Sequence, residues 1–190
     1  MAAFLDSHSH LADPAFESDA DAVIARALQT GAVGIVCIGE SIAAAGRAQA
    51  IAARFPLTVR FTAGVHPHDA ATFDPVADVA AIRRFVGDGA VAIGECGLDY
   101  HYDHSPRDRQ RDAFAAQLEL ARELRRPIVV HTREAEADTA EMIGEAARMG
   151  VIGVLHCFTG SISLARAAID AGWYVSFSGI VTFKKWTDDD

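Results

Sequence analysis

Cysteine, proline and long hydrophobic runs are all scarce in this sequence of 190 residues, which has three cysteines and six prolines. Cys37, Cys96 and Cys157 lack paired spacing, which argues against a disulfide framework and favours a reducing compartment. No apolar run approaches the roughly 18 residues of a membrane span. The first residues also lack the basic and apolar regions of a signal peptide. These absences predict a cytoplasmic protein without a membrane partner.

Positive charge is in deficit as well, since 17 basic residues face 26 acidic ones and give a formal net charge of −9. An acidic chain gains no general attraction to nucleic acid, so a polyanion would need local positive charge from a patch or a bound metal. The chain is 51% hydrophobic and shows no linker or low-complexity tract. Residues 1–190 are therefore expected to form a single domain.

Seven short runs rich in β-branched residues alternate with six intervals that have helical patterns. The runs are 3–8, 33–39, 58–65, 90–95, 127–131, 151–156 and 173–179. The clearest helices are 107–124, with Ser105 and Pro106 as its expected cap and first position, and 134–149. This alternation is typical of a parallel sheet covered by helices, either an open doubly wound sheet or a (β/α) barrel. No glycine-rich phosphate loop follows the first run, which weakens a dinucleotide-binding interpretation.

Polar residues gather where the predicted strands end. They include His8, His10, His66, Glu95, His131 and His156. In a parallel sheet these carboxyl ends lie on one side, and in a barrel they surround one mouth. Histidines at positions i and i+2 of a strand point the same way, so His8 and His10 can bind one cation. Four histidines and a carboxylate exceed what one catalytic ion uses, and two ions bridged by Glu95 are the simpler hypothesis.

Five motifs in this order resemble the TatD family of metal-dependent deoxyribonucleases, within the amidohydrolase superfamily. They are "DSHSHL" (6–11), "GVHPH" (64–68), "GECGLDY" (94–100), "PIVVHTREAEAD" (127–138) and "LHCFTGS" (155–161), and the helix "RQRDAFAAQLELA" (109–121) matches too. The resemblance implies an α/β fold, a TIM-like (β/α) barrel, with a centre of two divalent ions. Zinc, manganese and magnesium are the candidate ions, although magnesium suits four imidazoles least.

The resemblance also implies roles for individual residues. His8 and His10 would bind one ion, His131 and His156 the second, and Glu95 would bridge the two and take part in catalysis. His66 would contact the substrate or assist catalysis. Arg133 would pair with phosphate, with a salt bridge to Glu134 or another neighbour as the alternative. Further residues have lesser expected roles: Asp99 orienting a ligand histidine, His101 and His104 at the loop surface, and Cys96 as a buried, inert thiol.

The end of the sequence departs from the family pattern. The family continues to an eighth strand whose aspartate binds the first metal and acts as the base for the attacking water. About seven of the eight β/α units are expected here, so the barrel is predicted to be incomplete at its C-terminus. Asp188, Asp189 and Asp190 resemble the first turn of a further helix rather than a substitute ligand. The 190 residues alone are expected to be poorly stable and nearly inactive.

Three functions remain in competition. The leading hypothesis is a divalent-metal-dependent hydrolase that cleaves phosphodiesters by metal-bound hydroxide, as a 3'-5' exonuclease on single-stranded DNA. The second is a carboxyl-ester or amide hydrolase, including one for aminoacyl esters, that uses the same metal centre. The third is a non-catalytic remnant that binds metal. The predicted partner is single-stranded DNA or another phosphodiester, and the protein is expected to be a monomer.

Overall fold

A computed structural model describes residues 3–183 of the chain. It contains seven strands: β1 (Phe4–Ser9), β2 (Ala32–Cys37), β3 (Val59–Ala63), β4 (Ala92–Asp99), β5 (Ile128–Arg133), β6 (Gly153–Leu155) and β7 (Tyr174–Val175). All neighbouring strands pair in parallel, in the order β1-β2-β3-β4-β5-β6-β7. This sequential order excludes a doubly wound sheet, whose strand order reverses at a switch point.

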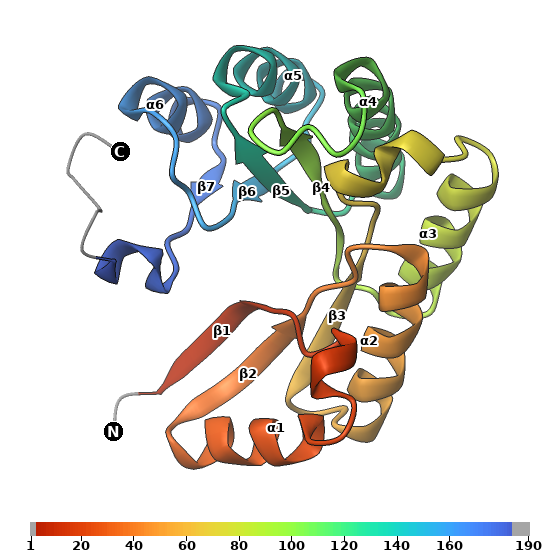
Figure 1. Ribbon diagram of the computed structural model, residues 1–190, viewed down its shortest axis with the longest axis vertical. Coiled ribbons are helices and arrows are strands. Elements are labelled where there is room, and N and C mark those ends of the chain that lie inside the picture. Colours follow the sequence, from red (N-terminus) through yellow and green to blue (C-terminus); the bar gives the residue numbers. More distant parts are fainter. Residues whose placement is uncertain (1–2, 184–190) are drawn as a thin grey trace.

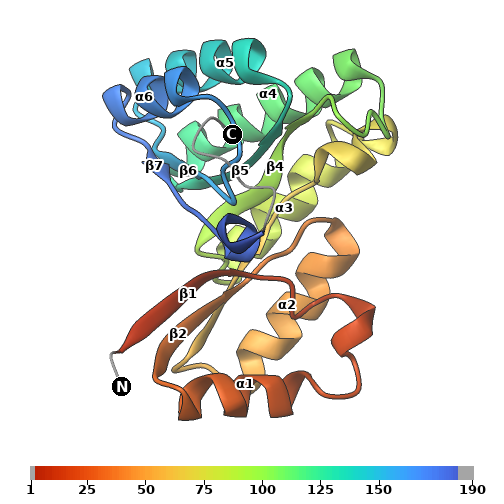
Figure 2. The same cartoon turned by 60° about the vertical axis from the view of Figure 1, so that its left-hand side comes forward.

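Helices occupy the intervals between the strands and cover the outer face of the curled sheet (Figure 1). They are α1 (Ala20–Gln29), α2 (Ile42–Arg54), α3 (Ala77–Gly87), α4 (Arg107–Leu124), α5 (Glu136–Arg148) and α6 (Ile162–Asp170). Three short 3₁₀ segments complete the described elements: η1 (Pro14–Phe16), η2 (Pro67–Thr72) and η3 (Gly179–Thr182). The result is a partial (β/α) barrel of seven strands and six α-helices among the described residues, in which β1 and β7 are the edge strands (Figure 2).

Strand β4 is the central strand, and all eight of its residues are buried. It is longer than the predicted run 90–95, because Gly94 and Gly97 let it pass very close to β5. Both glycines have positive φ, and a Cβ on Gly97 would lie 2.0 Å from the carbonyl oxygen of His131. The two glycines therefore bring Glu95, between them, next to the strand that carries His131.

Helix α4 has the predicted bounds, but its N-terminal cap differs from the prediction. Ser105 does not cap it. Pro106 is the N-cap residue, and the Ser105 hydroxyl instead donates to the carbonyl of His68 at 2.7 Å. The same hydroxyl accepts the N–H of Ala71 at 2.9 Å. Ser105 is buried and joins the loop before α4 to η2, so its hydroxyl satisfies backbone groups there that water cannot reach.

Two buried glutamines on α4 hold the ends of neighbouring strands. The Gln117 side chain accepts the N–H of Val65 at 2.9 Å and donates to the Val65 carbonyl at 3.0 Å. Gln110 makes the corresponding pair of bonds with the backbone of Asp99, at 2.8 and 3.0 Å. Helix α4 thereby positions the backbone just beyond β3 and at the end of β4, where the candidate site lies.

Candidate metal centre

The predicted ligands come together at the carboxyl ends of the strands. His8 lies in β1, Glu95 in β4 and His131 in β5, while His156 directly follows β6 and His66 comes three residues after β3. His10 follows β1 by one residue and is the most exposed of the set. Residues separated by up to 148 positions in the sequence thus surround one point, as the strand-end argument predicted.

The Glu95 carboxylate lies at the centre of this cluster and is only 2% exposed. Its Oε2 atom is 3.2 Å from His8 Nε2 and 3.6 Å from His10 Nε2. Its Oε1 atom is 2.5 Å from His156 Nε2 and 3.4 Å from His131 Nδ1. The two carboxylate oxygens therefore face different sets of imidazoles, since Oε1 also lies 3.5 Å from His66 Nε2, and this is the arrangement that a bridging ligand requires.

The spacing of these atoms is compatible with bound cations. His8 Nε2 and His10 Nε2 lie 3.1 Å apart, close to the separation of about 3.3 Å for two ligands at 2.0–2.1 Å from a tetrahedral ion. Glu95 Oε2, His156 Nε2 and His8 Nδ1 are buried without a hydrogen-bond partner among residues 3–183. Glu95 Oε2 and His156 Nε2 lie within the cluster, and a bound ion would satisfy these buried polar atoms.

Two three-residue groups have ligand atoms that all lie within 4.8 Å of one another: His8, His10 and Glu95, and His66, Glu95 and His131. The second group contains His66 where the resemblance implied His156. The Nδ1 atom of His66 accepts the N–H of His68 at 3.2 Å. This bond leaves the proton of a neutral imidazole on Nε2, which is 3.5 Å from Glu95 Oε1. A protonated Nε2 donates a hydrogen bond and does not bind a metal, which favours a substrate role for His66.

Two carboxylates outside the cluster orient its histidines. Glu40, just beyond β2, holds His10 Nδ1 at 2.7 Å, which directs His10 Nε2 toward Glu95. Asp99 accepts the Nε2–H of His131 at 3.0 Å, which leaves His131 Nδ1 on the Glu95 side. Such contacts select the tautomer and the ring orientation of a metal-binding histidine. The role of Asp99 was expected, whereas Glu40 was missed even though it also follows a predicted strand.

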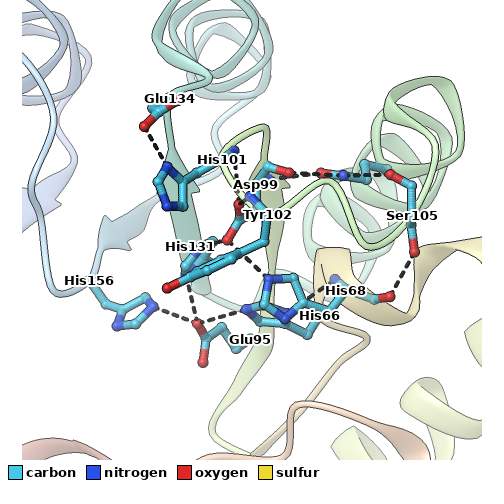
Figure 3. A network of polar contacts seen from close by, with 11 residues as sticks. His66, His68, Glu95, Asp99, His101, Tyr102, Ser105, His131, Glu134 and His156 are labelled. Carbon is cyan, nitrogen blue, oxygen red and sulfur yellow. Dashed lines mark hydrogen bonds and ion pairs between the residues drawn. The ribbon is translucent and has the colours of Figure 1, made fainter.

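Asp99 is the hub of a wider polar network (Figure 3). Its Oδ2 atom also accepts from His68 Nε2 at 3.0 Å, and its Oδ1 atom accepts the N–H groups of His101 and Tyr102 at 3.1 and 2.8 Å. Burial opposes ionisation of Asp99, but these donors outweigh it and hold the pKa of the carboxyl far below its usual value. The loop after β4 is thus tied to the carboxylate that orients His131.

Glu95 is ionised for a similar reason. Burial would raise the pKa of Glu95, but the surrounding imidazoles of His131, His156, His66 and His8 hold it well below its usual value. Burial raises the pKa of the neighbouring Cys96 thiol well above its usual value, which agrees with the expected inert thiol. The centre therefore presents a fixed negative charge among neutral or cationic rings.

Arg133 lies beside the cluster rather than in it. Its guanidinium carbon is 5.0 Å from the centre of the Tyr102 ring. The alternative of a salt bridge with Glu134 is wrong, because Glu134 pairs with His101 Nδ1 at 2.6 Å. Arg133 forms no ion pair within the described part of the chain, so its guanidinium is free to meet an anion.

In metal-free protein, we expect stability to fall as the pH rises from about 6.5 to 9. Burial alone would lower the pKa of His131, but Asp99 and Glu95 outweigh it and raise the pKa to about 9. Protonated His131 therefore favours the folded state below pH 6.5, and that contribution, on the order of 3 kcal/mol, disappears as the pH passes 9. Urea unfolding in EDTA across this range measures it. Added divalent metal should reduce the loss because it replaces the proton, and a flat or rising profile in EDTA would contradict the expectation.

The comparisons with known proteins agree with this geometry. An incomplete parallel (β/α) barrel with histidines and a glutamate at the carboxyl ends of its strands defines a class of metal-dependent hydrolases. Residues 5–189 match the family described as TatD related DNase, and the chain belongs to this family. None of the described helices is long and apolar enough to cross a membrane.

Curated relatives and solved structures point to the same family. The chain is 37% identical over 180 residues to the uncharacterized metal-dependent hydrolase YabD of Bacillus subtilis, covering 94% of the chain and 70% of the relative. It is 37% identical over 172 residues to the 3'-5' ssDNA/RNA exonuclease TatD of Salmonella typhimurium, covering 90% of the chain and 66% of the relative. The chain thus spans about two thirds of the length of these relatives.

Among solved structures, a hydrolase TatD family protein from Entamoeba histolytica superposes with a TM-score of 0.84 at 25% identity, covering 94% of this chain and 66% of that one. The TatD homolog YJJV from Escherichia coli superposes with a TM-score of 0.87 at 24% identity, covering 97% and 71%. The expected fold class is therefore confirmed. Asp188, Asp189 and Asp190, for which a helical first turn was expected, lie outside the described residues.

Proposed function

We propose that this protein is a divalent-metal-dependent phosphodiesterase that degrades single-stranded DNA from its 3' end. The observation that carries the proposal is the buried Glu95 carboxylate, whose two oxygens face two different histidine pairs. The family membership and the name of the Salmonella relative, a 3'-5' ssDNA/RNA exonuclease, support it. A cytoplasmic location and a monomeric state stay predictions.

The proposal assigns His8 and His10 to one divalent ion, His131 and His156 to a second, and Glu95 to both. Nitrogen and oxygen donors together suit zinc or manganese, and magnesium is the third candidate. Divalent ions in such a pair would supply Lewis-acid chemistry and activate water for attack on phosphorus. Glu95 contributes the fixed charge that keeps this donor set together, and Glu40 and Asp99 hold the rings of His10 and His131 in place.

His66 and Arg133 are assigned to the substrate. The Nε2–H of His66 is directed into the centre and can donate to a phosphate oxygen there. The Arg133 guanidinium lies on the same strand as His131, two residues further, and can pair with a phosphate. In an acidic protein these two groups and the bound ions provide the local positive charge that a polyanion needs.

The test is hydrolysis after metal removal and addition of zinc, manganese or magnesium, with the purified protein in excess over the oligonucleotide so that even the low activity expected of residues 1–190 is measured. Oligonucleotides labelled at the 5' or the 3' end reveal the direction of degradation, and a duplex of the same sequence tests the strand preference. A panel of carboxyl and aminoacyl esters tests the alternative hydrolase. Metal-dependent shortening of single strands from the 3' end supports the proposal. Turnover of esters alone, or bound metal without turnover on any substrate, would overturn it in favour of the second or third hypothesis.

Replacing His66 with glutamine or alanine should lower kcat by about 100-fold or more while the metal content stays unchanged. The reason is that a positioned proton donor contributes roughly 10²–10⁴ to the rate, whereas Nδ1 of His66 is occupied by the backbone and binds no ion. Elemental analysis and kinetics on the same preparations measure both quantities. A parallel loss of metal would show that His66 is a ligand, as in the second three-residue group.

A further inference from the structure

The loop after β4 carries two parallel aromatic rings at the rim of the candidate centre. The rings of Tyr102 and His104 lie 5.6 Å apart between their centres and only 3° from parallel. Both side chains are exposed, Tyr102 to 50%. The Tyr102 hydroxyl has no hydrogen-bond partner among residues 3–183, and half of the side chain is open to solvent.

Several contacts hold this pair in place relative to the centre. The N–H of Tyr102 donates to Asp99 Oδ1 at 2.8 Å, and Asp99 Oδ2 accepts from His131 Nε2. The His68 ring meets Tyr102 edge-on at 5.7 Å and lies 6.2 Å from the His131 ring. A single buried carboxylate and a single imidazole therefore connect Tyr102 to a proposed metal ligand (Figure 3).

An isolated exposed aromatic side chain would need no explanation. Here, however, the exposed ring has a fixed backbone, a second ring parallel to it and a cation beside it. The Arg133 guanidinium carbon lies 5.0 Å from the centre of the Tyr102 ring. Flat rings next to a free guanidinium are the combination with which proteins hold unpaired nucleotides, because bases stack on the rings and phosphates pair with the arginine.

We infer that Tyr102 and His104 form a stacking platform for an unpaired base next to the phosphodiester that the centre cleaves. This inference rests on the proposed function. It adds that the protein recognises the planar base of the substrate as well as its phosphate. Stacking is possible for every base, so the platform would favour single strands over duplexes without reading sequence. A duplex keeps its bases stacked on one another and cannot offer a free face.

Equilibrium binding of a fluorescein-labelled oligothymidylate with phosphorothioate linkages, which resist cleavage, is measured by anisotropy in the presence of the divalent metal and tests the platform with negligible turnover. The variants are Tyr102→Ala, Tyr102→Phe and His104→Ala. Tyr174→Ala is the matched control, because Tyr174 is 69% exposed and lines a cavity at the amino ends of the strands, beside Ile128 and Gly153. A second probe of equal length carries abasic residues and so has phosphates but no bases.

Tyr102→Ala should weaken binding of oligothymidylate by roughly 10- to 100-fold, as expected for the loss of one stacked base. His104→Ala should weaken it less, and Tyr102→Phe and Tyr174→Ala should bind within about threefold of the unmodified protein. The abasic probe should not distinguish Tyr102→Ala from the unmodified protein. Equal weakening on both probes, no weakening with oligothymidylate, or no binding of oligothymidylate by the unmodified protein would overturn the platform. If the unmodified protein binds with these differences but hydrolyses nothing, only the proposed function fails.

Discussion

Replacing Glu95 with glutamine is expected to remove most of the bound metal and to lower hydrolysis by roughly three orders of magnitude or more. Glutamine keeps the shape of the side chain but loses its charge, and its amide nitrogen cannot act as a ligand. Both histidine pairs lose their shared partner, since Oε2 faces His8 and His10 and Oε1 faces His131 and His156. Loss of about 4 kcal/mol of transition-state stabilisation corresponds to that change in rate.

Two further variants separate this effect from a general loss of negative charge. Glu145→Gln removes the same charge from an exposed site on α5 and should change neither metal content nor rate. Glu40→Gln removes the partner of His10 Nδ1 and should lower metal affinity by about 10–100-fold without abolishing binding. Elemental analysis after dialysis and kinetics on single-stranded DNA give both readouts. Full metal content in Glu95→Gln would mean that the histidines hold the ions without a bridge.

The convergence of the candidate ligands was predictable because it depends only on strand direction. Once seven parallel strands are recognised, His8, Glu95, His131 and His156 must share one edge, whatever the details of packing. By the same rule Glu40 should have been named, since it stands directly beyond the predicted strand 33–39. Glu40 belongs to none of the five motifs, so the sequence does not indicate its role. The structure does, because Glu40 lies 2.7 Å from His10 Nδ1.

Finer features of the site depend on contacts that the sequence does not reveal. The orientation of Glu95, with one oxygen toward each histidine pair, arises from the path of β4 between Gly94 and Gly97. The distinct behaviour of His66 comes from the N–H of His68 on its Nδ1 atom. Arg133 is expected from the sequence to meet phosphate, Glu134 or another neighbour, but its aromatic partner, seven residues after a predicted strand end, could not be foreseen.

The ends of helix α4 and strand β4 show which features can be predicted from local sequence and which depend on tertiary contacts. Helix α4 was predicted to the residue because its apolar stripe and flanking Pro106 are local features. Strand β4 runs to Asp99, beyond the predicted end at residue 95, because its second half is stabilised by pairing with β5. Serine is a common N-cap residue, but Ser105 is buried against η2, and its hydroxyl bonds to the backbone of His68 and Ala71 instead. Tertiary contacts override local preference at these points.

Among glycine-to-alanine substitutions near the site, Gly97→Ala is expected to lower the free energy of unfolding the most. The residue has a φ of +129°, and a Cβ there would lie 2.0 Å from the carbonyl oxygen of His131. That oxygen belongs to the backbone of a buried strand and cannot move aside. We expect a loss of more than 4 kcal/mol in the free energy of unfolding, or no folded protein, together with loss of metal because β5 carries His131.

Gly89→Ala separates the steric part of this cost from the conformational part. Gly89 has a φ of +111°, comparable to that of Gly97, but an added Cβ would meet nothing within 4 Å. Its substitution should therefore cost only about 1–3 kcal/mol from the strained backbone, with metal binding retained. Urea unfolding of both variants beside the unmodified protein measures the difference. Similar costs in the two variants would show that β4 and β5 are free to separate at the site, and in that case Glu95 would not be held rigidly against His131 by the close approach of the two strands.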